Sequence, residues 1–161
     1  MTFTTPIRII LVLLRLAMAW VFLYAASHQV FDSGFSVAGF LGHTTTFNRL
    51  FAPLTHPAIA PVISFLVGWG HLLIGLSLLL GLMTRAGALA GIVLMLLYWM
   101  AHLDFPYVDG PNNFLLDFHI VYALVLALLI AARAGRIVGL DSWAARQPQV
   151  QRVRLLAWAA G

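Results

Sequence analysis

Histidine and tyrosine side chains occur inside long apolar segments of this chain, where polar side chains are uncommon. His71, His102 and His119 lie in three different segments, and Tyr98 precedes His102 by one helical turn. Imidazole exchanges protons near neutral pH, and we expect the neutral imidazole and phenol groups to donate hydrogen bonds to carbonyl oxygens of a ligand. Imidazole also ligates haem iron and divalent metals. The residue types therefore indicate quinone chemistry, haem ligation or metal ligation.

Spacing places the three histidines at one depth. His71 and His119 precede Arg85 and Arg133, respectively, by the same number of residues, which corresponds to roughly 21 Å of helix. By the same measure, His102 lies roughly 22 Å beyond Gly87. A polar side chain at that depth is costly when it faces lipid, so we expect the rings to point into a helix bundle. For any single histidine the alternative is an interhelical hydrogen bond that stabilises the bundle by about 0.6–2 kcal/mol.

Composition shows which elements must hold these rings. Hydrophobic residues make up 62% of the 161 residues and charged residues 9%, against about 45–50% and about 25% in soluble domains. Apolar runs long enough to span a bilayer as helices indicate an all-α integral membrane four-helix bundle. Residues 1–134 would form this bundle, and residues 135–161 a basic tail on the inner membrane surface. The expected helices cover about residues 7–27, 57–83, 87–103 and 114–132.

Charge placement predicts the orientation of the bundle. The chain has nine arginines, five aspartates and neither lysine nor glutamate. If the helices alternate in direction, every arginine outside the membrane except Arg49 falls on one side, so we expect both termini in the cytoplasm. The positive charge thus reflects membrane orientation and not nucleic-acid binding. Residues 28–56 are expected to form an amphipathic lid on the outer surface, with Phe40, Phe47, Phe51 and Leu54 on its apolar face.

Short matches suggest two related helical hairpins, although chance similarity is the alternative in so apolar a chain. Leu23-Tyr24 followed by His28 matches Leu97-Tyr98 followed by His102. The repeat would add Tyr24 and His28 to the group of histidines. Arg15 is the remaining charge inside the first run, and it could contact a cofactor, form an interhelical hydrogen bond or extend to the inner membrane surface.

Two carboxylates lie near the histidines, but their spacing argues against a metal site. Asp104 follows His102 by two residues, and Asp117 precedes His119 by two. Residues two apart on a helix point about 200° from each other, so only one of each pair should face inward. We therefore expect no metal site. We interpret Asp117 as a capping or interfacial carboxylate, and Asn112 or Asn113 as the N-cap of the last helix.

Several motifs resemble the DoxX/DoxD family of small four-helix membrane proteins. The most specific is residues 68–85, which read GWGHLLIGLSLLLGLMTR. An early arginine in the first helix, Asn112-Asn113-Phe114 at the start of the last helix, and the exit from Gly135-Arg136 to Leu140-Asp141 extend the resemblance over about residues 10 to 143. The family includes the membrane subunit of thiosulfate:quinone oxidoreductase, which implies a prokaryotic inner-membrane location and quinone as a ligand.

These observations favour the membrane subunit of a quinone-linked oxidoreductase that binds quinone near the outer leaflet. His71, His102 and His119 would contact or protonate the quinone oxygens, and Tyr98 would orient the ring; Tyr24, His28 and Arg15 are further candidate contacts. The chain has no flavin or nucleotide motif, so a partner redox subunit is implied. The alternatives are a non-catalytic membrane scaffold for redox partners and, less favoured, a haem protein with two histidine ligands.

Overall fold

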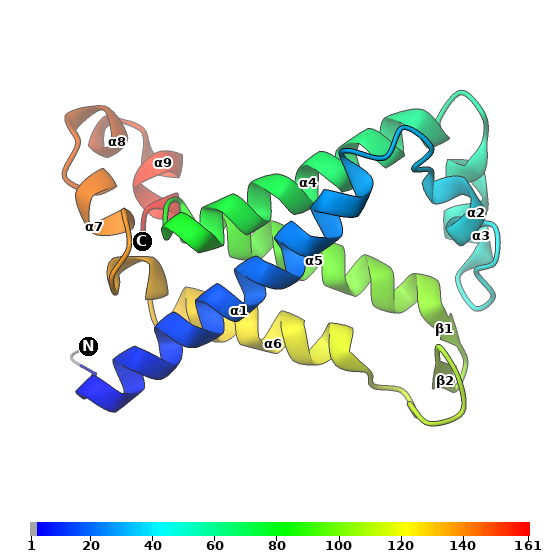
Figure 1. The fold of residues 1–161 in the computed structure, drawn as a ribbon, viewed down its shortest axis with the longest axis horizontal. Helices are drawn as coiled ribbons and strands as arrows, with labels where there is room; N and C mark the ends of the chain where they lie inside the picture. Colours follow the sequence, from blue (N-terminus) through cyan, green and yellow to red (C-terminus); the bar gives the residue numbers. More distant parts are fainter. Residues whose placement is uncertain (1–2) are drawn as a thin grey trace.

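A computed structural model of the chain describes residues 3–161 and is built almost entirely from helices (Figure 1). Three helices are long and apolar enough to cross a membrane: α1 (Thr5–Gln29), α4 (Ala60–Leu80) and α5 (Thr84–His102). A fourth apolar helix, α6 (Phe118–Ala131), is shorter. At 1.5 Å per residue, α6 is about 21 Å long and α1 about 37 Å. The architecture is therefore that of an all-α integral membrane protein.

The helices pack as two pairs. Helix α1 lies against α4, α5 lies against α6, and the contact between α4 and α5 joins the pairs. Gly75 allows α4 to approach α1 closely, since a Cβ atom there would lie 2.7 Å from the Leu23 side chain. The fully buried side chains between the helices include Phe22, Leu78, Leu126 and Leu129. This pairing is the one expected of two hairpins. The second helix of each hairpin is associated with the same triplet, Arg85-Ala86-Gly87 and Arg133-Ala134-Gly135, but the two differ in conformation: Arg85 is helical and Arg133 is left-handed, with φ 50°.

The last helix begins later than the sequence predicts. Its expected start was residue 114, but Phe114 pairs with Tyr107 in a β-bridge and the Leu115 N–H donates to the Pro106 carbonyl. Tyr107 belongs to a small hairpin of β1 (Leu103–Asp104) and β2 (Tyr107–Val108), an addition to the expected all-helical chain. The N-cap is Asp117, not Asn112 or Asn113 as predicted from the sequence.

Residues 37–55 form a compact segment over the ends of α4 and α5, which we call the lid segment. It contains α2 (Val37–Leu41), α3 (Asn48–Phe51) and the 3₁₀ turn η1 (Ala52–Thr55). The Val37 N–H donates to Ser64 Oγ of α4 at 3.0 Å. Apolar side chains of the lid segment, Phe40 and Phe51 among them, pack with Ile63, Val67 and Ala101 of α4 and α5.

The C-terminal tail folds back on the bundle. After η2 (Ala134–Arg136), it forms α7 (Asp141–Ala144), α8 (Pro148–Arg152) and α9 (Arg154–Ala159) beside the turn between α4 and α5 (Figure 1). The tail therefore lies at the end of the bundle where α1 starts and α6 stops, which we call the arginine end. The lid segment and the β-hairpin lie at the opposite, lid end.

Candidate functional site

The structure brings together one ring from α4, two from α5 and one from α6. The ring centroids of His102 and His119 are 5.0 Å apart, and the rings are stacked. Tyr98 lies 5.7 Å from His71 and 5.8 Å from His119, nearly parallel to the latter. His71 and His119 are buried, whereas Tyr98 and His102 are partly exposed. We call these four residues the histidine cluster, with Tyr98 at its centre.

One nitrogen of each imidazole is already engaged. The Nδ1 atoms of His71 and His102 contact the backbone carbonyls one turn earlier, of Val67 and Tyr98, both at 2.8 Å. His119 Nδ1 contacts the Asp117 carboxylate at 2.6 Å. Because a carbonyl or carboxylate oxygen only accepts, Nδ1 carries the proton in all three rings. In its neutral form each ring therefore presents Nε2 as an acceptor, which corrects the expectation that the neutral rings donate to ligand carbonyls.

Asp117 holds His119 from outside the helix. As the N-cap residue it has an extended backbone, its Oδ1 accepts from the His119 N–H at 3.0 Å, and its Oδ2 accepts from the imidazole. Both residues are buried. The expectation that only one of this pair faces inward was wrong, because the 200° separation holds only when both residues are helical. The role of Asp117 as a capping carboxylate is confirmed.

A pocket of about 250 Å³ adjoins the histidine cluster, between α1, α5 and α6. Helices α1 and α6 lie close together at the arginine end and diverge toward the lid end (Figure 1). Sequence reasoning missed two polar residues here, Tyr122 and Gln29, and the Oε1 atom of Gln29 is buried and lacks a hydrogen-bond partner among the described residues. Gln29 shares a helical face with the buried Phe22 and Ala26, and this spacing was the available signal. The lining comprises Val21, Ala25, Gln29, His71, Met95, Tyr98, His102, Phe118, His119 and Tyr122.

Three of the predicted site residues lie elsewhere. Tyr24 is 57% exposed, and it contacts the exposed His28 edge-on at 4.8 Å on the outer face of α1. Arg15 is 2% exposed and donates to the backbone carbonyls of residues 134, 137 and 138, at 2.9, 3.1 and 2.8 Å. These contacts tie α1 to the segment after α6 at the arginine end. Arg15 therefore does not extend to the membrane surface.

The lid segment reaches the histidine cluster through one aromatic side chain. The ring of Phe40 lies 4.7 Å from that of His102 and 5.7 Å from that of Tyr98. The lid segment, α4 and α5 line a second, apolar cavity of about 100 Å³, which Phe40 and Tyr98 both border. Phe40 thus closes the cluster on the side of the lid, and the open side faces α1 and α6.

The histidine cluster has hydrogen-bond acceptors surrounded by aromatic rings. Its geometry can be compared with what a metal ion or a haem would need. Within residues 3–161, no three His, Cys, Asp or Glu side chains are grouped to hold a metal ion. His102 and His119 stack on each other, so they do not flank a space in which a porphyrin could lie. The arrangement is suited to hydrogen bonding and proton exchange with an aromatic ligand that carries hydroxyl groups.

Comparison with known proteins identifies the family of this chain. No curated protein and no solved structure matches the chain. A family model described as DoxX matches residues 10–103, which include α1, the lid segment, α4 and α5, and thus His71, Tyr98 and His102 but not His119. Because this match covers more than half of the 161 residues, the chain belongs to the DoxX family of membrane proteins, which includes membrane subunits of quinone oxidoreductases.

Proposed function

We propose that the protein binds a quinone and its quinol at the histidine cluster and serves as the membrane subunit of a quinone-linked oxidoreductase, similar to thiosulfate:quinone oxidoreductase. The observation that carries this proposal is the set of free Nε2 atoms of His71, His102 and His119 beside a pocket of about 250 Å³. A quinol has two hydroxyl donors on an aromatic ring. The cluster has acceptors for the donors and aromatic side chains to pack against the ring.

The hydrogen-bond inventory of the pocket fits both redox forms. Toward quinol hydroxyls, the imidazole Nε2 atoms and the unpartnered Gln29 Oε1 accept. Toward quinone carbonyls, the Tyr98 hydroxyl and the Gln29 amide donate, and a histidine that has gained a proton donates from Nε2. The buried Oε1 atom of Gln29 supports a ligand here, because a buried acceptor without a partner costs about 1–3 kcal/mol.

His119 is the residue best placed to give a proton to a quinone oxygen. With Nε2 protonated, its imidazolium would be stabilised by the Asp117 carboxylate at Nδ1 through a charge-assisted hydrogen bond, and Nε2 would donate the proton as the quinone gains electrons. Tyr98, stacked on His119, would fix the ligand ring. A bound quinone supplies two-electron redox chemistry, and the electrons would come from a partner redox subunit, since the chain shows no flavin or nucleotide motif.

The membrane arrangement follows from the two ends of the bundle. With the arginine end in the cytoplasm of a prokaryotic inner membrane, α6 completes a four-helix transmembrane bundle and the lid segment lies on the outer face. The nonhelical backbone before Asp117 has hydrogen-bond partners for its polar groups: the Leu115 N–H donates to the Pro106 carbonyl, and the Trp99 indole donates to the Leu115 carbonyl, both at 2.9 Å. A lipid-soluble ligand would enter between α1 and α6 from the outer leaflet.

The test is quinol binding by the purified protein. Solvent extraction of the wild-type protein, purified in mild detergent, should release quinone, and a short-chain quinol should bind in titration. His71→Phe and His119→Phe should each weaken this binding at least tenfold, because phenylalanine removes the acceptor and keeps the ring. His28→Phe, in an exposed ring outside the pocket, is the matched control and should change binding less than twofold.

Two outcomes would favour the other functions. A Soret absorbance band that is lost in both cluster variants would indicate haem. Full quinol binding by both variants, or no quinone in the extract and no binding in titration, would contradict the quinone site and favour the scaffold. The packing of the tail against the bundle already argues against a tail free to recruit partners, because Asp141 and Ala160 are both buried.

A further inference from the structure

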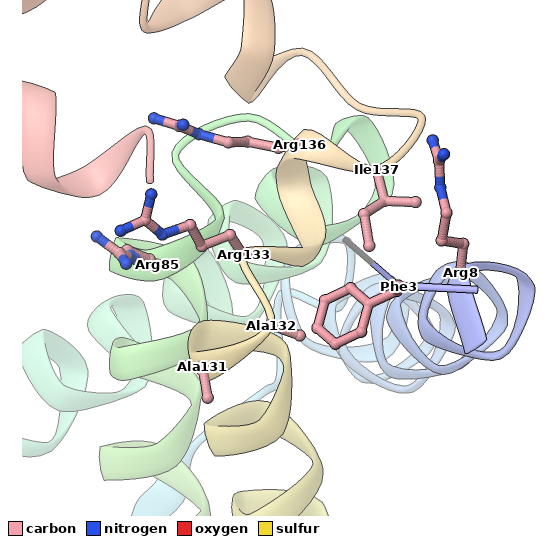
Figure 2. A pocket seen from close by; sticks show the side chains of 8 residues that line it. All are labelled: Phe3, Arg8, Arg85, Ala131, Ala132, Arg133, Arg136 and Ile137. Atoms are coloured by element: carbon pink, nitrogen blue, oxygen red, sulfur yellow. The ribbon is translucent and has the colours of Figure 1, made fainter. Parts of the chain in front are cut away.

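A third pocket, of about 580 Å³, lies at the arginine end and is lined by four arginines from separate parts of the chain. Arg8 comes from α1 and Arg85 from α5, while Arg133 and Arg136 follow α6. Figure 2 shows that Arg85, Arg133 and Arg136 extend to the same side, beside the C-terminal helix, whereas Arg8 lies on the other side of Ile137. We call this pocket the arginine basin.

No aspartate side chain among the described residues forms an ion pair with the arginines of the basin. Among residues 3–161, the only side-chain ion pair is that of Asp117 with His119, at the lid end. Asp141 is the acidic residue of the tail, but its two oxygens accept from the Met83 and Thr84 N–H groups at 2.6 and 3.2 Å. Arg85 Nε is buried without a partner. The basin therefore holds several positive charges with unused donors.

Local backbone structure adds to this positive potential. Arg85 lies in the first turn of α5, where the helix dipole already favours an anion and disfavours a cation. Arg133 adopts a left-handed backbone, with φ 50°, just after α6, where glycine or asparagine is usual. The start of α5 thus adds to the positive potential around Arg85, whereas the C-terminal end of α6 beside Arg133 favours a cation.

An apolar groove continues from the basin along α1. It has a volume of about 320 Å³, shares Arg8 and Ile137 with the basin, and is otherwise lined by Thr5, Ile9, Val12, Leu13 and Val138. Ile9 is 54% exposed and Leu13 59%. Because α1 enters the membrane in this direction, the groove runs from the charged surface into the hydrocarbon region.

We propose that the arginine basin binds the phosphate headgroup of an anionic phospholipid, with an acyl chain in the α1 groove. Guanidinium groups bind phosphate oxygens with paired hydrogen bonds, and basic pockets between transmembrane helices bind lipid headgroups. The three converging arginines carry more positive charge than one phosphodiester can neutralise, so the site prefers a lipid with two phosphates. The groove distinguishes a lipid from free phosphate, which has no apolar part to bury.

Lipid binding by the full chain in detergent tests the proposal, with native mass spectrometry as the readout. Cardiolipin is the diphosphate probe and phosphatidylcholine the uncharged comparison. The double variant Arg133→Gln/Arg136→Gln should weaken cardiolipin binding at least tenfold. The control Arg152→Gln/Arg154→Gln removes the same charge from exposed tail positions outside the basin and should change binding less than twofold. Equal losses in the two variants would show general charge attraction and overturn the site.

Two further arms identify the source of the phosphate. Inorganic phosphate at millimolar concentration should not displace cardiolipin; displacement would assign the basin to soluble phosphate and overturn the lipid proposal. Val12→Trp, which fills the groove without changing charge, should weaken cardiolipin binding several-fold. Cardiolipin binding equal to that of phosphatidylcholine would likewise contradict the proposal. None of these outcomes depends on the quinone site, which lies at the other end of the bundle.

Discussion

Nδ1 of each cluster histidine is bound to an acceptor on its own helix or helix cap, and this leaves Nε2 for a ligand. His71 and His102 use the carbonyl one turn earlier, which any helical histidine could reach in the right rotamer. The sequence predicts the shared depth of the rings but not their rotamers, because rotamers depend on tertiary packing. For this reason the expected donors became acceptors.

Asp117→Asn separates helix capping from histidine orientation. Asparagine is also a good N-cap, so we expect the free energy of unfolding to change by less than about 1 kcal/mol. Its amide is neutral and cannot stabilise a protonated His119, so quinone reduction with electrons from the partner subunit should fall at least tenfold. Nitrogen-15 NMR of labelled histidine would follow the loss of the Nδ1–H tautomer. An unchanged tautomer and an unchanged rate would contradict a positioning role for Asp117.

Arg15→Met distinguishes a structural arginine from a ligand contact. The change leaves three carbonyl groups at the arginine end without their donor, and we expect it to lower the free energy of unfolding by at least about 3 kcal/mol in denaturation with SDS. Arg15→Lys keeps the positive charge but not the several N–H donors of the guanidinium, so it should lower the free energy of unfolding by less than Arg15→Met. Quinol binding per folded molecule should remain. Loss of binding at full stability would instead place Arg15 in the quinol site, as the sequence suggested.

Helix α5 receives its N-terminal cap from a residue far away in the chain. Asp141, at the start of α7, accepts from Met83 and Thr84 and is 1% exposed. Gly135 makes room for this contact, since a Cβ atom there would clash with the side chains of Asp141 and Thr84. The tail is therefore fixed to the turn between α4 and α5 and does not simply rest on lipid.

Asp141→Ala tests this attachment. Two buried N–H groups lose their acceptor, so we expect a loss of about 1–3 kcal/mol in the free energy of unfolding. We also expect faster trypsin cleavage at Arg146, Arg152 and Arg154 as the tail detaches. Asp32→Ala is the control, because Asp32 is exposed and accepts only from the nearby Gly34 N–H. Equal cleavage rates in the two variants would show that Asp141 does not hold the tail.

Apolar runs bounded by Gly, Pro or Arg predicted α1, α4 and α5 to within three residues at each end, because burial in lipid demands long continuous helices. The start of α6 and the shape of the lid segment could not be predicted in this way. Both depend on contacts with distant residues, such as the Pro106 carbonyl for Leu115 and Ser64 for Val37. The location of Tyr24 and His28 could not be predicted either, because only the suggested repeat assigned them to the histidine cluster.

The bundle as a whole is polarised, with the proposed quinol site toward one end and the arginine basin at the other. The two sites differ in their chemistry. The proposed quinol site has hydrogen-bond acceptors among aromatic rings, whereas the arginine basin has unpaired cations beside an apolar groove. A bilayer with an anionic inner leaflet would orient such a molecule, since each arginine near that surface contributes about 1 kcal/mol. Anchoring at the arginine basin would then set the depth of the histidine cluster.

The absence of cysteine makes this orientation directly measurable, since a single introduced thiol is the only reactive one. Ser33 at the lid end and Gln149 in the tail are both exposed, and neither side chain forms a hydrogen bond among the described residues. With the lid outside, a membrane-impermeant maleimide should label Ser33→Cys in intact cells. Gln149→Cys should react only after permeabilisation, and the reverse pattern would invert the proposed topology.

Leu124→Cys on α6 completes the test, because this short helix decides whether the bundle has four spans. Leu124 is 66% exposed, so in the absence of a bilayer its thiol would react readily. If α6 spans the membrane, the thiol faces hydrocarbon and should resist a polar maleimide on both sides, yet react after unfolding in SDS. Rapid labelling in intact membranes would place α6 in water, and the proposed access route from lipid between α1 and α6 would then be lost.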